Sequence, residues 1–192
     1  MKIGIVLLAA GKSERFGSNK LLADFAGKPM ICRALETMHA LEAARKCVVA
    51  GSEEIAALAG AYGFDVIINR EPELGQAHSI ALGVGAMREM DAVLLMVADQ
   101  PLLRAASLEG LVSAFAASGR GIACLRDRTH RGNPAVFAAR YMPKLLAISG
   151  DRGAKGILRA HEDDLLVVDC LGGDELSDAD TPQTLALLQE KE

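Results

Sequence analysis

The sequence predicts an α/β fold with a mostly parallel central sheet and helices on both faces. Two uninterrupted apolar runs, residues 3–8 and 92–97, are typical of strands that are buried on both faces at the centre of such a sheet. Strand-like and helix-like stretches alternate along the whole chain and are joined by short connections. Because the chain has 192 residues, we predict one Rossmann-like domain that spans residues 1–192.

The other elements follow from shorter patterns between these two runs and after them. Further strands are expected from short apolar runs at 47–50, 64–68, 122–125, 135–137 and 165–168. Helices are expected between them, at 30–40 after Pro29, and at 53–61, 76–90, 107–117, 140–147, 154–160 and 181–189. Within 76–90, Ile80, Val84 and Met87 share one helical face, which indicates the side that packs against the sheet.

The composition excludes several functional classes. A hydrophobic content of 51% and a charged content of 24% are typical of a globular protein. The net charge is −4 with scattered Lys and Arg, so no nucleic-acid surface is expected. No signal peptide or membrane-length apolar run is evident, which favours a cytoplasmic protein without a membrane partner. The four cysteines lack metal or disulfide spacing and are expected to be buried thiols: Cys32, Cys47, Cys124 and Cys170.

The loop after the first strand is the most informative segment. Residues 9–20 read AAGKSERFGSNK. Small residues let phosphates approach backbone N–H groups, and Arg15 and Lys20 can neutralise phosphate charge. The loop fits neither GxxxxGK[ST] nor GxGxxG, and an ordinary strand-to-helix turn with solvated cations is the alternative. We interpret it as a triphosphate-binding loop.

Carboxylates follow at two further places. Ligands of α/β sheets bind outside the carboxyl ends of the strands, and Asp99 comes directly after the apolar run 92–97. It is well placed to hold Mg²⁺, which binds through one or two carboxylates plus substrate phosphates, although a turn-forming Asp before Pro101 is equally common. Near the C-terminus, Asp180 or Thr181 can simply cap the last helix.

Three other segments carry groups that can bind substrates. Gly75 permits close approach, and the amide of Gln76 can both donate to and accept from a base edge, unless this is a plain helix start. A Gly-Asp-Arg-Gly turn at 150–153 leads to Lys155, which can grip an anionic phosphate. Turn chemistry explains residues 132–134 equally well as substrate binding.

The loop matches AAGxSxRFGxxK, the signature of the MobA-like nucleotidyltransferases, and the chain resembles this family from residue 3 to residue 182. Within the family it is most similar to the cytidylyl branch, which couples CTP to the phosphate of molybdopterin. The segments ADQP, GQxxS, RGNP, GDxGAK and DxDTP are in the family's order. The resemblance implies catalytic roles for Arg15, Lys20 and Asp99, and a site for Mg²⁺ or Mn²⁺ on Asp99 and Asp180, with Asp178 as a weaker candidate ligand. It implies acceptor contacts from Asn133, Asp151 and Lys155. The residues that it implies as nucleotide contacts are Ala9, Ala10, Gly11, Ser13, Arg15, Lys20, Gln76 and Ser79.

The chain departs from the family pattern at Lys12, Glu14 and Ala179, none of which is an expected ligand. Ala10 resembles the LAAG of the cytidylyl branch rather than the LAGG of the guanylyl branch, and its methyl restricts the room for a purine. Two alternatives stay open. The acceptor can be a sugar phosphate or another small phosphorylated molecule, or the protein can be a non-catalytic nucleotide-binding accessory in molybdoenzyme maturation. A transient contact with a molybdenum hydroxylase or its chaperone is expected from the resemblance.

Overall fold

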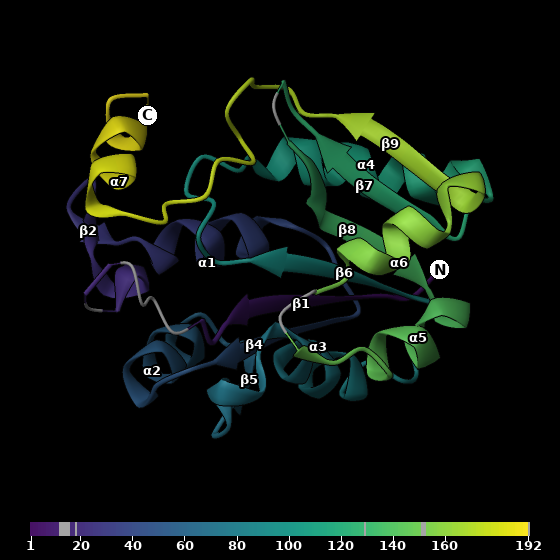
Figure 1. The fold of residues 1–192 in the computed structure, drawn as a ribbon, viewed down its shortest axis with the longest axis horizontal. Helices are drawn as coiled ribbons and strands as arrows, with labels where there is room; N and C mark the ends of the chain where they lie inside the picture. The colour runs from purple at the N-terminus through teal and green to yellow at the C-terminus, as the bar shows by residue number, and fades with distance from the viewer. Residues whose placement is uncertain (12–15, 18, 129, 151–152, 192) are drawn as a thin grey trace.

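The computed structural model describes residues 1–11, 16–17, 19–128, 130–150 and 153–191. Its central sheet has the strand order β5-β4-β1-β6-β8-β7-β9 (Figure 1). The strands are β1 (Ile3–Ala9), β4 (Arg45–Ala50), β5 (Asp65–Ile68), β6 (Ala92–Val97), β7 (Ile122–Arg126), β8 (Arg131–Ala138) and β9 (Leu165–Asp169). Within this sheet, only the described pairings of β8 with β6 and with β7 are antiparallel. The mostly parallel sheet is therefore confirmed.

Helices cover both faces of this sheet. One core cluster contains residues of α1 (Ile31–Ala40), α2 (Glu53–Ala61), α4 (Ala105–Ser118) and α7 (Pro182–Gln189). The other contains residues of α3 (Gln76–Gly85), α5 (Met142–Leu146) and α6 (Lys155–Ala160). Along β1, Ile5 and Leu7 belong to the first cluster and Val6 and Leu8 to the second. Because both faces of the strand are buried, its sequence is apolar without alternation.

Short elements complete the fold. A small antiparallel pair consists of β2 (Asp24–Phe25) and β3 (Lys28–Pro29). The 3-10 helices are η1 (Lys20–Leu22), η2 (Pro72–Leu74), η3 (Ala139–Tyr141) and η5 (Glu162–Asp164). Among the described helices, none combines the length and the apolar character that crossing a bilayer would require.

The predicted strands and helices are present, most of them within two residues of the expected bounds, and three differ more in their extent. The helix expected over 76–90 ends at Gly85, although Met87 is still fully buried in the turns that follow. The helix expected over 140–147 is divided between η3 and α5. The strand expected at 135–137 begins at Arg131, so residues 132–134 lie within β8 and not in a turn. The turn interpretation was wrong because the chain stays extended through an irregularity, where the pairing with β7 shifts register.

The four cysteines are free thiols. Three are buried, and Cys170 is half-buried. Burial raises the pKa of both Cys47 and Cys124 to about 11. These side chains therefore stay protonated at neutral pH and act as small apolar core residues.

One carboxylate joins three segments at the edge of the sheet. Asp164 accepts hydrogen bonds from Arg140 Nη2, Tyr141 Oη and Gly121 N, each at 2.8 Å. The Arg140 hydrogen bond is the main reason that the pKa of Asp164 falls from 3.8 to about 2. A lowered folded-state pKa stabilises the protein above the unfolded pKa, and this contribution is lost as the pH falls through the folded value.

We therefore expect Asp164→Asn to lower the free energy of unfolding by about 1–2 kcal/mol at pH 7, because the ion pair is partly screened by solvent. The difference should shrink as the pH falls from about 4 to 2. Denaturant titrations across this pH range measure it, with Asp163→Asn as the control on the adjacent carboxylate. A difference that is independent of pH would contradict the assignment.

The order of the strands defines where ligands can bind. The chain leaves β1 toward β4 on one side and later returns to β6 on the other, so a crevice opens at the carboxyl ends of β1 and β6. The arrowheads of both strands point toward the end of the molecule where α7 and β2 lie (Figure 1). Ala98 N donates to Leu8 O at 3.1 Å, and Gly51 N donates to Ala9 O at 3.0 Å. The loops that leave these strands are thereby held side by side.

Candidate active site

Lys20 is held at the start of a short helix beside this crevice. The side chain of Asn19 caps η1 by accepting a hydrogen bond from Leu21 N at 3.2 Å. Leu21 is 4% exposed and fixes η1 in the core. The Lys20 side chain is 12% exposed and directed at two carboxylates, so its position is determined by the fold rather than by solvent.

Three distant parts of the sequence meet at this lysine. Its Nζ lies 2.7 Å from Asp99 Oδ2 and 2.9 Å from Asp180 Oδ1. Burial by itself lowers the pKa of Lys20, but the charges and hydrogen bonds of Asp99 and Asp180 outweigh it, so the pKa lies above its usual value. The lysine is therefore a fixed positive charge at the centre of the cluster.

The two carboxylates are positioned by the backbone around them. Asp99 follows β6, and its carbonyl oxygen accepts a hydrogen bond from Ala179 N at 2.9 Å. The last helix is capped by Thr181, whose Oγ1 accepts from Thr184 N at 3.1 Å. Because Thr181 supplies the cap, the carboxylate of Asp180 is left to pair with Lys20.

This pair of carboxylates fits a divalent cation. One cationic group, the Lys20 ammonium, already lies between the Asp99 and Asp180 oxygens. Within the described part of the chain, no cluster of three or more His, Cys, Asp or Glu side chains could hold a metal ion. A cation held by these two residues would need further oxygen ligands, which water or substrate phosphates can supply, as is usual for Mg²⁺ beside phosphates.

A pocket of about 130 Å³ adjoins the cluster. It brings together residues predicted for the metal, the nucleotide and the acceptor. The lining residues that bear on the site are Gln76, Asp99, Gln100, Asn133, Lys155 and Asp178. The structure therefore brings Gln76, Asp99 and Lys155, one residue predicted for each of the three subsites, to the same pocket.

Gln76 is the first residue of α3 and directly follows Gly75, whose φ of 81° is favourable only for glycine. Its side-chain oxygen packs against Gly153, where an added Cβ would overlap it. Gly153 itself has a φ of 53°. The sequence analysis did not single out this glycine, and its only signal was its place at the end of the 150–153 turn.

Ser79 does not reach the pocket surface. It is 5% exposed, and its Oγ accepts a hydrogen bond from Asn69 Nδ2 at 2.9 Å. Asn69 Oδ1 in turn accepts from Glu71 N at 2.9 Å. This buried network ties the segment before η2 to α3.

The small residues at the end of β1 and directly after it are mostly enclosed. Ala9 is 2% exposed and Ala10 is 9% exposed, whereas Gly11 is exposed. Ala10 belongs to the core cluster on the α3 side, and a Cβ added at Gly51 would lie 2.9 Å from the Ala10 Cα. Three residues of the predicted site lie outside the described residues: Ser13, Arg15 and Asp151.

Asp178 and Gln100 are further polar residues of the pocket. Asp178 is exposed as a residue, but neighbouring atoms partly desolvate its carboxyl, and this desolvation raises the pKa of the carboxyl. The negative charge of Asp99 raises the pKa further. Gln100 Nε2 donates to Asp178 Oδ1 at 3.1 Å. The sequence analysis gave Gln100 no role, although the residue lies in the ADQP segment that resembles the family pattern.

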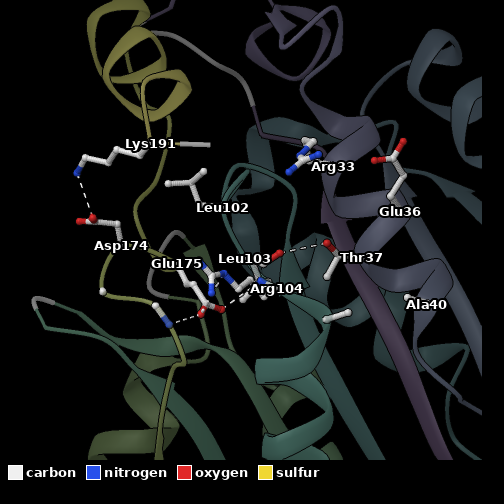
Figure 2. Close-up of a pocket in the computed structure, with 13 residues that line it drawn as sticks. Arg33, Glu36, Thr37, Ala40, Leu102, Leu103, Arg104, Asp174, Glu175 and Lys191 are labelled. Carbon is white, nitrogen blue, oxygen red and sulfur yellow. Dashed lines mark hydrogen bonds and ion pairs between the residues drawn. The ribbon is translucent and has the colours of Figure 1, made fainter.

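A larger cavity of about 460 Å³ lies between α1, the start of α4 and residues 172–175 (Figure 2). Four of its charged groups form two pairs: Lys191 Nζ lies 3.2 Å from Asp174 Oδ2, and Arg104 Nε lies 4.0 Å from Glu175 Oε1. None of the described residues predicted for the site lines this cavity. We therefore assign the candidate active site to the smaller pocket.

Curated relatives match the chain over different lengths. The purine catabolism protein PucB of Bacillus subtilis is 30% identical over 190 residues, which cover 93% of this chain and 91% of PucB. A probable molybdenum cofactor guanylyltransferase of Pyrococcus horikoshii is 30% identical over 156 residues, or 81% of this chain and 78% of that protein. The bifunctional protein GlmU of Rhizorhabdus wittichii is 38% identical over 112 residues, or 56% of this chain. The chain matches only 25% of the length of that GlmU.

Solved structures agree on the fold. Rv0371c of Mycobacterium tuberculosis superposes with a TM-score of 0.86 at 23% identity, covering 99% of this chain and 98% of that one. A structure of Rv0371c in complex with manganese gives a TM-score of 0.83 at 20% identity and covers all of both chains. The family model of the MobA-like NTP transferase domain matches residues 5–165. This match covers most of the sequence, and the chain belongs to the family of MobA-like NTP transferases.

Proposed function

We propose that this nucleotidyltransferase moves CMP from CTP to the phosphate of molybdopterin and releases pyrophosphate. The observation that carries the proposal is the cluster of Lys20, Asp99 and Asp180 at the carboxyl ends of β1 and β6. Such a cluster can hold a divalent cation and a triphosphate together. The choice of CTP rests on Ala10, and the choice of acceptor rests on the resemblance and on the relative from P. horikoshii.

The chemistry needs charge neutralisation more than proton transfer. A phosphate oxygen of the acceptor attacks the α-phosphorus of CTP, the new P–O bond forms, and the bond to the leaving pyrophosphate breaks. Because the attacking oxygen is already anionic at neutral pH, no general base is required. The charges to be stabilised lie on the phosphates, where positioned cations have their largest effect.

Each residue of the cluster has a defined task in this proposal. Asp99 and Asp180 would hold Mg²⁺ or Mn²⁺, which supplies positive charge to the phosphates when bound. Lys20, whose ammonium now occupies the space between the carboxylates, would donate to the β- and γ-phosphates. Arg15, which lies outside the described residues, is proposed to assist it.

The acceptor side of the pocket supports an anionic second substrate. Lys155 begins α6 and is exposed, and it lines the same pocket as Asp99 and Asn133. We propose that Lys155 binds the acceptor phosphate and that Asn133 orients the acceptor. A sugar phosphate is the second candidate, because the GlmU relatives match more than half of this chain.

Pyrophosphate release tests the proposal. Each NTP is offered with molybdenum-loaded molybdopterin, with a panel of hexose 1-phosphates, or with no acceptor. The proposal expects release with CTP and molybdopterin, dependent on Mg²⁺ or Mn²⁺. Release only with a hexose phosphate would support the second candidate. Nucleotide binding without release under any condition would indicate a non-catalytic accessory protein.

The base preference can be tested separately with Ala10→Gly. We expect CTP to be preferred over GTP, and the variant to weaken this preference by about 1 kcal/mol, the lower end for a single methyl group. A small effect is expected because Ala10 is only 9% exposed. Binding of CTP and GTP is measured for both proteins. Ala92→Gly, which removes a fully buried methyl at the start of β6, at the end of the strand away from the pocket, is the control. An unchanged ratio in Ala10→Gly would mean that other residues, Gln76 first, read the base.

A further inference from the structure

Gln100 connects three segments of the active site through one amide group. The residue is 5% exposed. Its Nε2 donates to Asp178 Oδ1 at 3.1 Å and to Leu176 O at 3.2 Å, with Asn133 O at 3.4 Å. One amide thus contacts β8 and the segment before α7 from its position beside Asp99.

The orientation of this amide is fixed by its surroundings. Three acceptor oxygens surround one end, so the NH₂ group must occupy that end and the carbonyl oxygen the other. No described residue donates to Gln100 Oε1, which is buried. Burial of an acceptor without a hydrogen-bond partner destabilises the folded protein. The hydrogen bonds that Gln100 Nε2 donates offset this cost.

These hydrogen bonds hold the segment that directly precedes Asp180. The segment 176–179 is held at one end by the Gln100 amide and at the other by the hydrogen bond from Ala179 N to Asp99 O, 2.9 Å long. Asp180 is the next residue, and its carboxylate reaches the same lysine as Asp99. A loosened segment would therefore separate the two carboxylates.

We propose that Gln100 is a positioning residue that sets the distance between the Asp99 and Asp180 carboxylates and keeps Asn133 beside them. The inference rests on the proposed function in one respect, namely that these carboxylates hold a metal ion. Hydrogen-bond partners of this kind commonly change metal affinity 10–100-fold when removed, because small displacements of the ligands weaken every bond to the ion.

Gln100→Met tests the proposal, since it keeps the length of the side chain and removes both polar atoms of the amide. Ser107→Ala is the matched control. Ser107 is 3% exposed, and its Oγ accepts a hydrogen bond from Leu171 N at 3.1 Å, so this variant also removes a buried tie to the C-terminal segment. If Gln100→Met does not fold, Gln100→Glu keeps the shape and replaces the donors by acceptors.

The first readouts use the protein without nucleotide. Hydrogen exchange of the Ala179 amide should rise about tenfold or more in Gln100→Met, and Mn²⁺ affinity should fall about 10–100-fold. Ser107→Ala should change neither. In turnover, kcat should fall more than the KM for the acceptor rises.

Equal exchange and equal Mn²⁺ affinity in the two variants would overturn the inference. Because both readouts are taken without substrate, they remain informative if the wild-type protein releases no pyrophosphate. The absence of pyrophosphate release would contradict the proposed function. The positioning role of Gln100 would still be supported by the exchange and Mn²⁺-binding results.

Discussion

Lys20→Met is expected to lower kcat by roughly 10²–10³-fold, the effect of removing one preorganised donor from a developing charge. The lysine is the cation closest to both carboxylates among the described contacts, and in the proposed reaction it neutralises the triphosphate. Pyrophosphate release at saturating CTP and acceptor measures the effect. Activity close to that of the wild type would contradict the phosphate role.

The same variant should also be less stable than the wild type. Lys20 is 12% exposed, and its loss removes the ammonium group that lies between the negative charges of Asp99 and Asp180. Adding Mg²⁺ or Mn²⁺ should restore part of the melting temperature. Lys28→Met is the control, because Lys28 pairs with Glu36 at 2.7 Å but its side chain is 59% exposed. An equal loss of stability in both variants would contradict the central position of Lys20.

Asp99→Asn is expected to abolish most metal-dependent turnover while CTP still binds. Asparagine keeps the shape of the side chain and an oxygen that Lys20 can contact, but it loses the charge that holds a divalent cation. The hydrogen bond from Ala179 N is retained, because it is made to the backbone carbonyl of residue 99. The fold around the site should therefore be unchanged.

A metal titration of initial rates, together with CTP binding, measures this effect. The control is Asp174→Asn, since Asp174 lies in the same C-terminal segment and pairs with Lys191 at 3.2 Å, away from the cluster. We expect the control to follow the wild-type titration. If Asp99→Asn follows it as well, the metal is bound elsewhere.

The sequence predicted the sheet well because its central strands are buried on both faces. A continuous apolar run has few alternatives to a central parallel strand, so β1 and β6 were identified at nearly their observed bounds. The direction of β8 could not be predicted, because strand pairing depends on contacts far apart in the chain. The irregularity at residues 132–134 also carries Gly and Pro, which locally favour a turn.

The site was predicted as a set of residues rather than as an arrangement. Lys20 and Asp99 were found because each follows a central strand, and Asp180 was found through the resemblance. That one ammonium group joins both carboxylates could not be predicted, since residues 20 and 180 are separated by 160 positions. The proposed role of Gln100 depends on hydrogen bonds to the backbone oxygens of Asn133 and Leu176. Every residue carries a backbone oxygen, so the residue types in the sequence do not predict these contacts.

The contact of Lys20 with Asp180 has a consequence for cooperativity. It closes a loop of 160 residues and relies on α7, in which only Leu185 and Leu188 are buried among the described residues. The β1–β6 pairing, by contrast, lies at the centre of the sheet, where opening requires global unfolding. We therefore expect detachment of α7 to be a sub-global event that leaves the sheet intact and loosens the segment that carries Asp180. In the proposed enzyme, activity would then report on a local opening that circular dichroism of the sheet would not detect.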